Sequence, residues 1–281
     1  MPREIDPPTI QRDFLLSALA EGKRLDGRLP LEMREIRLEF GEALGWCRCH
    51  LGKTSVLAQV TATVVKPRDD RPYEGFLLIH SEISPMASSV YEAGRSSEDE
   101  VLIARLLEKS IRRTEAVDRE SLCIVAGEQV WQLRLTLHFL ADAGNLLDCA
   151  SLSAMTALRH FRKPEVEVTG DEVIFHSPDE RAPVLLAIHH TPLCITFAYF
   201  DSLQPIIDPT HLETVLSTGT LTLTLNAQRE LCVLSKAGGT PLAASEIMGV
   251  VHVGVDRVRI MVKIVEDALE KDRGERVVEV R

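Results

Sequence analysis

The order of strand-like and helical segments along this sequence predicts an α+β protein with two related lobes. In each half of the chain, segments rich in β-branched residues are followed by segments of helical period. The length of 281 residues is sufficient for two lobes that each bury a core. We therefore predict an N-terminal helix and turn over residues 1–30, a first lobe over residues 31–165 and a second lobe over residues 185–281.

The first half begins with apolar residues at helical spacing, for which Thr9 is a suitable N-cap. Gly41 and Gly52 then separate three β-branched segments, which we expect to form antiparallel strands. The predicted helices span residues 9–21, 98–115 and 146–161, and the predicted strands span residues 36–40, 43–51, 54–65, 76–80 and 130–140.

The predicted helix over residues 98–115 is amphipathic, with one apolar face and one heavily charged face. Its apolar face is expected to contain Val101, Leu102, Leu106, Leu107 and Ile111. The charged residues on the other face are therefore available for ion pairs or for a ligand.

The second half follows a connector over residues 164–182, in which short strand-like pieces are mixed with Gly170 and Pro178. The same order of strands and helices then returns. We predict strands over residues 193–200 and 204–208, a short helix over 210–217, a hairpin of residues 218–225 with 230–235, and a long helix over 243–269.

The composition is that of a folded globular protein, with 45% hydrophobic and 26% charged residues. The longest apolar runs are much shorter than the roughly 20 residues that span a bilayer, and the N-terminus lacks the pattern of a secretory signal. We expect an intracellular protein without a membrane segment. None of the six cysteines forms a Cys-x-x-Cys pair, so we expect reduced thiols that mostly pack as small apolar groups.

The charge and the motifs narrow the possible functions. The net charge of −10 repels nucleic acid, so any RNA contact must come from a local cluster of arginine and lysine. The chain has no phosphate-binding P-loop, no Gly-x-Ser-x-Gly elbow and no His-Glu-x-x-His helix. These patterns predict no cofactor and no metal ion.

Several motifs follow one another along the chain: LDGR at residues 25–28, LGKTSVLAQV at 51–60, RPYEGFL at 71–77, the segment from Arg95 to Val166, and IIDPTHLE at 206–213. In this order they resemble the RNase PH family, in particular the PM/Scl type of RNase PH-like subunit in the eukaryotic RNA exosome ring. The resemblance is strongest from Arg95 to Val166 and extends over nearly the whole chain. It implies the RNase PH fold, with two split β-α-β lobes like the second domain of ribosomal protein S5.

In catalytic members of this family, two aspartates six positions apart bind a metal ion or act on the scissile phosphate. Asp208 matches the first aspartate, but Thr214 stands at the second position and can neither hold a metal ion nor transfer a proton near neutral pH. Asp208 is then a remnant, and its structural alternative is to cap the short helix that begins near Thr210.

Catalytic members also bind inorganic phosphate with a glycine that is followed by threonine and arginine. Here Gly144 is followed by Asn145 and Leu146, so the guanidinium that would pair with phosphate is missing, and Asp148 adds repulsion. The resemblance therefore implies an RNase PH fold with a degenerate active site, in which no residue is catalytic.

The RNA-binding candidates are Arg105 and Arg112, which match arginines that face RNA in the family, together with Arg113 and Arg95. Because Arg105 and Arg112 are seven residues apart, we expect both on one helix face. The basic loop over residues 66–71 is a secondary candidate. The alternative is a solvated helix face on which these arginines pair with Glu98, Glu108 and Glu115.

The resemblance implies a non-catalytic ring subunit that scaffolds 3'-to-5' RNA processing and degradation, including rRNA maturation, and lines a channel for single-stranded RNA. Its expected partners are other RNase PH-like ring subunits, S1/KH cap subunits and associated exoribonucleases. Its expected locations are the nucleus, nucleolus and cytoplasm. An active phosphate-dependent 3'-to-5' exoribonuclease is the alternative.

Overall fold

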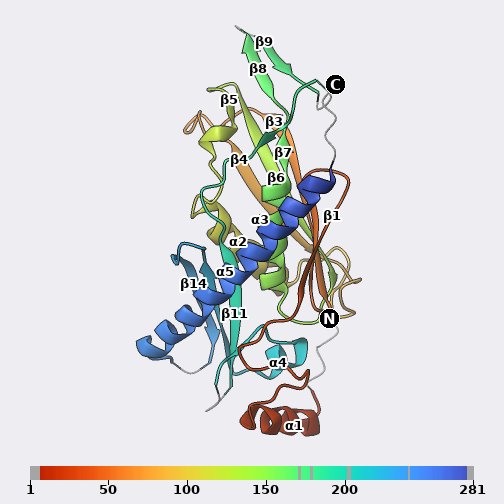
Figure 1. Ribbon diagram of the computed structural model, residues 1–281, viewed down its shortest axis with the longest axis vertical. Helices are drawn as coiled ribbons and strands as arrows, with labels where there is room; N and C mark the ends of the chain where they lie inside the picture. The colour runs from red at the N-terminus through yellow and green to blue at the C-terminus, as the bar shows by residue number, and fades with distance from the viewer. Residues whose placement is uncertain (1–6, 170–171, 178–179, 201–203, 240, 277–281) are drawn as a thin grey trace.

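The computed structural model describes residues 7–169, 172–177, 180–200, 204–239 and 241–276. The chain forms an elongated body in which helix α5 runs diagonally across the two lobes (Figure 1). The outer ends of the predicted first and last regions, residues 1–6 and 277–281, lie outside the described residues.

The first lobe contains a six-stranded sheet with the strand order β1-β2-β3-β6-β4, and a short strand β5 also pairs with β6. All neighbours are antiparallel except β4, which runs parallel to β6. The three antiparallel strands expected at the start of the lobe are confirmed. The strands are β1 (Ile36–Phe40), β2 (Trp46–Leu51), β3 (Thr54–Val65), β4 (Phe76–Ile83), β5 (Cys123–Val125, preceded by the 3₁₀ turn Glu120–Leu122) and β6 (Gln129–Ala141).

The predicted helix over residues 98–115 is shorter and differently oriented than expected. It consists of α2 (Glu98–Leu107), followed by a π-helical turn over Glu108–Arg112. The buried apolar side chains are Ile103, Leu107 and Ile111, whereas Leu102 is 57% exposed. The prediction of the apolar face was therefore partly wrong. Ile103, which it left out, is buried, and Leu102, which it included, is exposed.

Helix α3 (Leu146–His160) lies between the two lobes and contacts strands of both sheets. Thirteen of its fifteen residues are buried, as expected of a helix that is packed on all sides. Ala150, Ala154 and Ala157 are fully buried, and their small side chains allow close approach of the neighbouring strands. This helix joins the two lobes into one hydrophobic core.

The second lobe repeats the pattern with a four-stranded sheet in the order β12-β11-β13-β14. The connector expected over residues 164–182 contains the antiparallel strand pair β8-β9, and the short pair β7-β10 flanks it. The elements are β7 (Arg162–Lys163), β8 (Val166–Thr169), β9 (Glu172–Phe175), β10 (Val184–Leu185), β11 (Leu193–Tyr199), β12 (Ile206–Ile207), α4 (His211–Leu216), β13 (Gly219–Leu225), β14 (Leu231–Gly238) and α5 (Ala244–Glu275).

Helix α1 (Thr9–Ala20) lies at one end of the body, below α4 in Figure 1. Leu15 packs against Ala198, Phe200 and Ile206 of the second lobe. The prediction of Thr9 as N-cap was wrong, because the helix begins at Thr9 itself and Pro8 occupies the cap position without a side-chain hydrogen bond.

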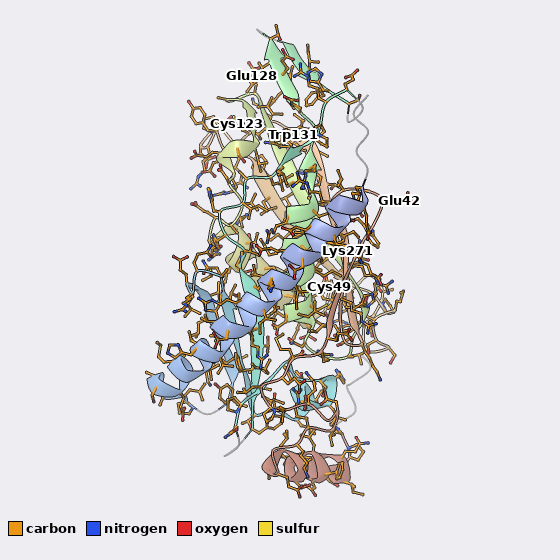
Figure 2. The ribbon with its side chains drawn as sticks, viewed as in Figure 1. Glu42, Cys49, Cys123, Glu128, Trp131 and Lys271 are labelled. Atoms are coloured by element: carbon orange, nitrogen blue, oxygen red, sulfur yellow. The ribbon has the colours of Figure 1, made fainter. Side chains whose placement is uncertain are left out.

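The cysteines are free thiols, four of them buried and two half-buried. Figure 2 shows Cys49 near the middle of the molecule and Cys123 towards the end of the first lobe that lies far from α1. Among the described helices, none combines the length and the apolar character needed to cross a bilayer.

Candidate nucleic-acid interface and acidic site

Asp208 follows directly after β12 and lies in the interior between the lobes, where it is fully buried. Its backbone has φ 51°, a left-handed conformation that aspartate tolerates better than most residues. The prediction that Asp208 caps helix α4 was wrong. Thr210 is the N-cap and forms a capping box with Glu213, whose carboxylate accepts the Thr210 N–H at 2.7 Å.

Both carboxylate oxygens of Asp208 accept hydrogen bonds from side chains of this chain. Oδ1 accepts from Arg34 Nη2 at 2.7 Å and from Asn145 Nδ2 at 2.7 Å. Oδ2 accepts from Arg28 Nη1, Arg34 Nε and the Arg34 backbone N–H, each at 2.9 Å. Burial alone would raise the pKa of Asp208, but these donors, above all Arg34, hold it below its ordinary value. Neither oxygen remains free for a metal ion or a substrate.

Thr214, at the position of the second acid, is exposed on α4. Its hydroxyl donates to the Thr210 carbonyl at 3.0 Å, one helical turn back. Thr214 carries no charge and its hydroxyl is bonded within its own helix, so it does not act as a second acid beside Asp208.

The loop that binds phosphate in catalytic relatives is closed here against helix α4. Gly144 has φ 90°, and a Cβ on it would lie 2.3 Å from the His211 backbone nitrogen, so only glycine fits. The next residue, Asn145, is 9% exposed and uses its amide to bridge Asp148 and Asp208 at 2.8 and 2.7 Å. Leu146 is buried where those relatives have arginine.

Asp148 is the second buried acid of this region. It accepts the Thr196 N–H and hydroxyl, each at 2.8 Å. Burial raises its pKa to about 7, and the nearby charge of Asp208 acts in the same direction. We call Arg28, Arg34, Asn145, Asp148 and Asp208 the acidic site. Both carboxylates are bonded within this internal network, whereas Asn145 Oδ1 is buried without a hydrogen-bond partner.

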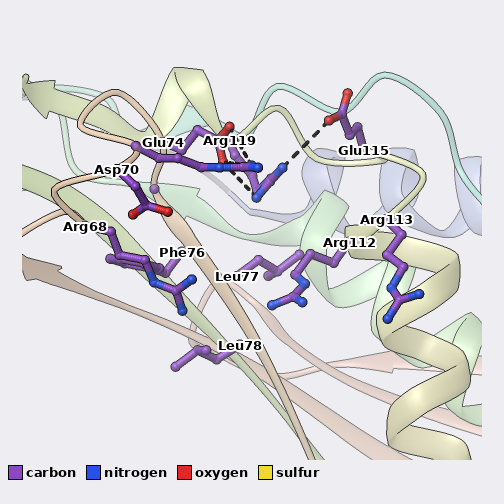
Figure 3. A pocket seen from close by; sticks show the side chains of 12 residues that line it. Arg68, Asp70, Glu74, Phe76, Leu77, Leu78, Arg112, Arg113, Glu115 and Arg119 are labelled. Carbon is purple, nitrogen blue, oxygen red and sulfur yellow. Dashed lines mark hydrogen bonds and ion pairs between the residues drawn. The ribbon is translucent and has the colours of Figure 1, made fainter.

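A second group of charged side chains surrounds an open cavity of about 410 Å³ in the first lobe. Figure 3 shows side chains from the loop before β4 facing those that follow α2. We call this cavity the arginine pocket. Its charged lining residues are Arg68, Arg71, Arg112, Arg113 and Arg119 together with Asp70, Glu74 and Glu115.

Three of these arginines are paired with carboxylates. Arg119 lies 2.9 Å from Glu74 and 3.7 Å from Glu115, and Arg71 lies 3.2 Å from Glu74. Arg112 lies 2.6 Å from Glu108. These pairs consume most of the positive charge of the pocket.

Arg68 and Arg113 differ from the other three arginines. The Arg68 guanidinium lies 5.6 Å from the centre of the Phe76 ring, a cation–π contact that leaves its charge unneutralised. Arg113 is exposed and forms no ion pair with any described residue. These two side chains are therefore free to bind an anion at the pocket.

The π-helical turn changes which arginine is aligned with Arg105. The Arg113 N–H donates to the Glu108 carbonyl at 3.2 Å, five residues back, so this turn contains one more residue than an α-helical turn. One extra residue shifts the following side chains by roughly 100°. With this extra residue, helix geometry predicts that Arg113, rather than Arg112, aligns with Arg105.

The structure separates the remaining predicted RNA-binding residues. Arg105 is exposed on α2 and has no acidic partner among the described residues, whereas Arg95 lies 3.9 Å from Glu92 in the loop before α2. Of the predicted ion pairs, that of Arg112 with Glu108 is the only one that forms within the described part of the chain.

The sequence analysis missed Arg119 and Phe76, because only the tertiary structure brings them to the pocket. It also missed the roles of Arg28 and Arg34 at Asp208. In the part of the chain that the structure describes, no group of three or more His, Cys, Asp or Glu side chains could hold a metal ion.

Comparison with known proteins places both lobes of the chain in one family. Residues 32–164 match domain 1 and residues 190–257 match domain 2 of the 3' exoribonuclease family, RNase PH. The chain is 40% identical to the exosome complex component rrp45 of Schizosaccharomyces pombe, over 97% of this chain and 94% of that protein. It is 42% identical to the human exosome complex component RRP45, over 94% of this chain but only 60% of the human protein.

Solved structures give the same relationship. A chain of the Archaeoglobus fulgidus exosome with RNA bound to the active site superimposes with a TM-score of 0.79 at 28% identity, over 91% of this chain and 97% of that one. A chain of an archaeal exosome core gives a TM-score of 0.77 at 26% identity, over 92% and 97%. The predicted RNase PH fold is confirmed, and the chain belongs to the RNase PH, or 3' exoribonuclease, family.

Proposed function

We propose that this chain is a core ring subunit of an RNA exosome, and that it supports 3'-to-5' RNA processing and degradation without cleaving RNA itself. Relatives from fission yeast, budding yeast and human, each about 40% identical over nearly all of this chain, are exosome complex components. Its partners would be other RNase PH-like subunits, S1/KH cap subunits and associated exoribonucleases. Its locations would be those of the exosome, the nucleus, nucleolus and cytoplasm.

The single observation that carries the non-catalytic part of the proposal is the state of Asp208. A catalytic carboxylate must reach a metal ion or the scissile phosphate, but both oxygens of Asp208 are buried and bonded to Arg28, Arg34 and Asn145. The absence of an acid at Thr214 and of an arginine at Leu146 agrees with this.

The test of this proposal is a phosphorolysis assay on the purified chain, alone and in the reconstituted ring. Labelled single-stranded RNA is incubated with Mg²⁺ and inorganic phosphate, beside an active 3' exoribonuclease of the family as positive control. We expect no nucleoside diphosphate from this chain. Release of nucleoside diphosphates by the isolated chain would establish the alternative, an active phosphate-dependent exoribonuclease.

The RNA-lining part of the proposal assigns contacts to Arg105 and Arg113, with Arg68 at the arginine pocket beside them. Arginine suits a channel through which any sequence must pass, because its guanidinium pairs with phosphates without reading the bases. Arg112 and Arg95 contribute less, because each already lies near a glutamate. Crosslinking of RNA to the assembled ring, followed by mapping of the modified peptides, tests these contacts.

A further inference from the structure

The segment between α1 and β1, residues 21–35, is joined to the second lobe by three arginines, one buried and two half-buried. We call this segment the strap. Its backbone contacts β12 directly, since the Ile207 N–H donates to the Pro30 carbonyl at 2.9 Å. The backbone N–H of Arg34 and the side chains of Arg24, Arg28 and Arg34 add further hydrogen bonds to the second lobe.

Arg24 makes the deepest of these contacts. Its guanidinium is fully buried and forms a two-point ion pair with Glu213, with Nε 2.9 Å from Oε1. Its remaining donors bond the carbonyls of Ile207 and Asp208 at 2.8 and 2.9 Å. A guanidinium is tolerated in the interior only when its charge and its donors are satisfied in this way.

Asp208 receives the other two arginines of the strap. Arg28 and Arg34 both donate to Oδ2, and Arg34 also donates to the Ala143 and Gly144 carbonyls at 3.2 and 3.0 Å. The carboxylate therefore joins the strap, the loop before α3 and the end of β12 at one point. No other acid contacts Arg34 in the described part of the chain.

We infer that Asp208 is a positioning residue that anchors the strap, and through the strap holds helix α1 against the second lobe. In a catalytic relative, an acid at this position would act on the substrate, whereas here arginines of the chain itself occupy it. The inference concerns the order of residues 9–35 and does not depend on whether the chain cleaves RNA. Its success or failure is therefore separate from that of the proposed function.

Hydrogen–deuterium exchange with mass spectrometry on the full chain tests this role. The Asp208→Asn variant keeps the shape of the side chain but removes its charge. It should accelerate amide exchange in residues 9–35 by about tenfold or more, as expected from the loss of a charge-assisted hydrogen bond, and leave β13 little changed. Arg28→Ala, which alters only the strap side of the same contact, should give a smaller acceleration in the same residues.

Thr214→Ala is the matched control, because Thr214 is exposed on the adjacent helix and does not contact the strap. It should leave exchange in residues 9–35 unchanged. If Asp208→Asn fails to fold, Arg28→Ala decides alone. The inference is overturned if exchange in residues 9–35 stays at the wild-type rate, or if it rises equally throughout the chain, in the variants that fold.

Discussion

The acidic site and the arginine pocket contain the same residue types, arginines and carboxylates, and differ in burial. At the acidic site Asp208 is fully buried and every carboxylate lone pair is used by a donor of the chain. At the arginine pocket the pairs are open to solvent, and Arg68 and Arg113 have no carboxylate partner among the residues that the structure describes. A buried charge must be fully paired to be tolerated, whereas an exposed one can exchange its partner for a ligand. Burial therefore distinguishes structural from ligand-binding charges here.

The largest expected effect is on stability at the acidic site. Asp208→Ala leaves the Arg34 guanidinium, whose side chain is 10% exposed, without its buried carboxylate, and should lower the free energy of unfolding by about 3–5 kcal/mol. Urea titration at pH 7 measures this, with Thr214→Ala as a control that should change stability by less than about 0.5 kcal/mol. An equal loss of stability in Asp208→Ala and Thr214→Ala would contradict the conclusion that the buried carboxylate contributes more to stability than the exposed hydroxyl.

The pH dependence of stability should show the opposite pKa shifts of the two buried acids. Asp148 keeps its proton in the folded state up to about pH 7, while the unfolded chain loses it near 3.8. Its contribution is therefore fully present below pH 3.8 and is lost as the pH rises to about 7, by up to roughly 4 kcal/mol. The pKa of Asp208 is lowered, so its contribution is lost as the pH falls below 3.8.

Asp148→Asn removes the contribution of Asp148 to the pH dependence of stability, because an amide resembles the protonated acid and does not titrate. The variant should lose less stability than the wild type between pH 4.5 and 7.5, measured by urea titration at each pH. An unchanged difference between these two pH values would show that Asp148 is ionised in the folded protein throughout.

For Arg113 of the arginine pocket and Arg105 of helix α2, the expected effect is on RNA binding. Arg105→Ala with Arg113→Ala should weaken binding of single-stranded RNA to the reconstituted ring by about tenfold. It should also reduce the slope of log affinity against log salt by about 0.7 per lost phosphate contact. Anisotropy measurements over a salt series give both values. Wild-type affinity and slope would exclude these arginines from the RNA path.

Arg112→Ala is the matched comparison for Arg113→Ala. The two arginines are adjacent in the sequence, and the π-helical turn determines which of them aligns with Arg105. Since Arg112 is paired with Glu108, its loss should cost about 0.3–0.5 kcal/mol of stability and change RNA binding less than Arg113→Ala does. Thermal melts and the same anisotropy series measure the two effects. A larger loss of RNA binding for Arg112→Ala than for Arg113→Ala would mean that the extra residue in the π-helical turn does not determine which arginine contacts RNA.

The smallest expected effect is that of restoring the second acid. Thr214→Asp should produce no phosphorolysis, because Leu146 still leaves phosphate without its guanidinium partner and Asp208 is still bonded to Arg28 and Arg34. The phosphorolysis assay above measures this. Nucleoside diphosphate release from this single variant would mean that Asp208 can leave its internal partners.

The sequence by itself determined the order of strands and helices and the changed positions at Thr214, Asn145 and Leu146. Period-two and helical patterns depend on neighbours within a few residues, so β3, β6 and α3 could be placed to within one or two residues. The family motifs indicated the fold and Asp208, because a motif is recognised from residue types at given sequence positions, without coordinates.

Only the tertiary structure decided what the individual charged side chains do. The partners of Asp208 come from residues 28, 34 and 145, and the arginine pocket combines residues 68–78 with residues 112–119. The exchange of Arg112 for Arg113 depends on the π-helical turn, in which the N–H groups of residues 113 and 116 bond carbonyls five residues back. Each of these outcomes is set by burial or by one extra residue in a turn. Both arise from packing between distant segments, which local sequence patterns do not encode.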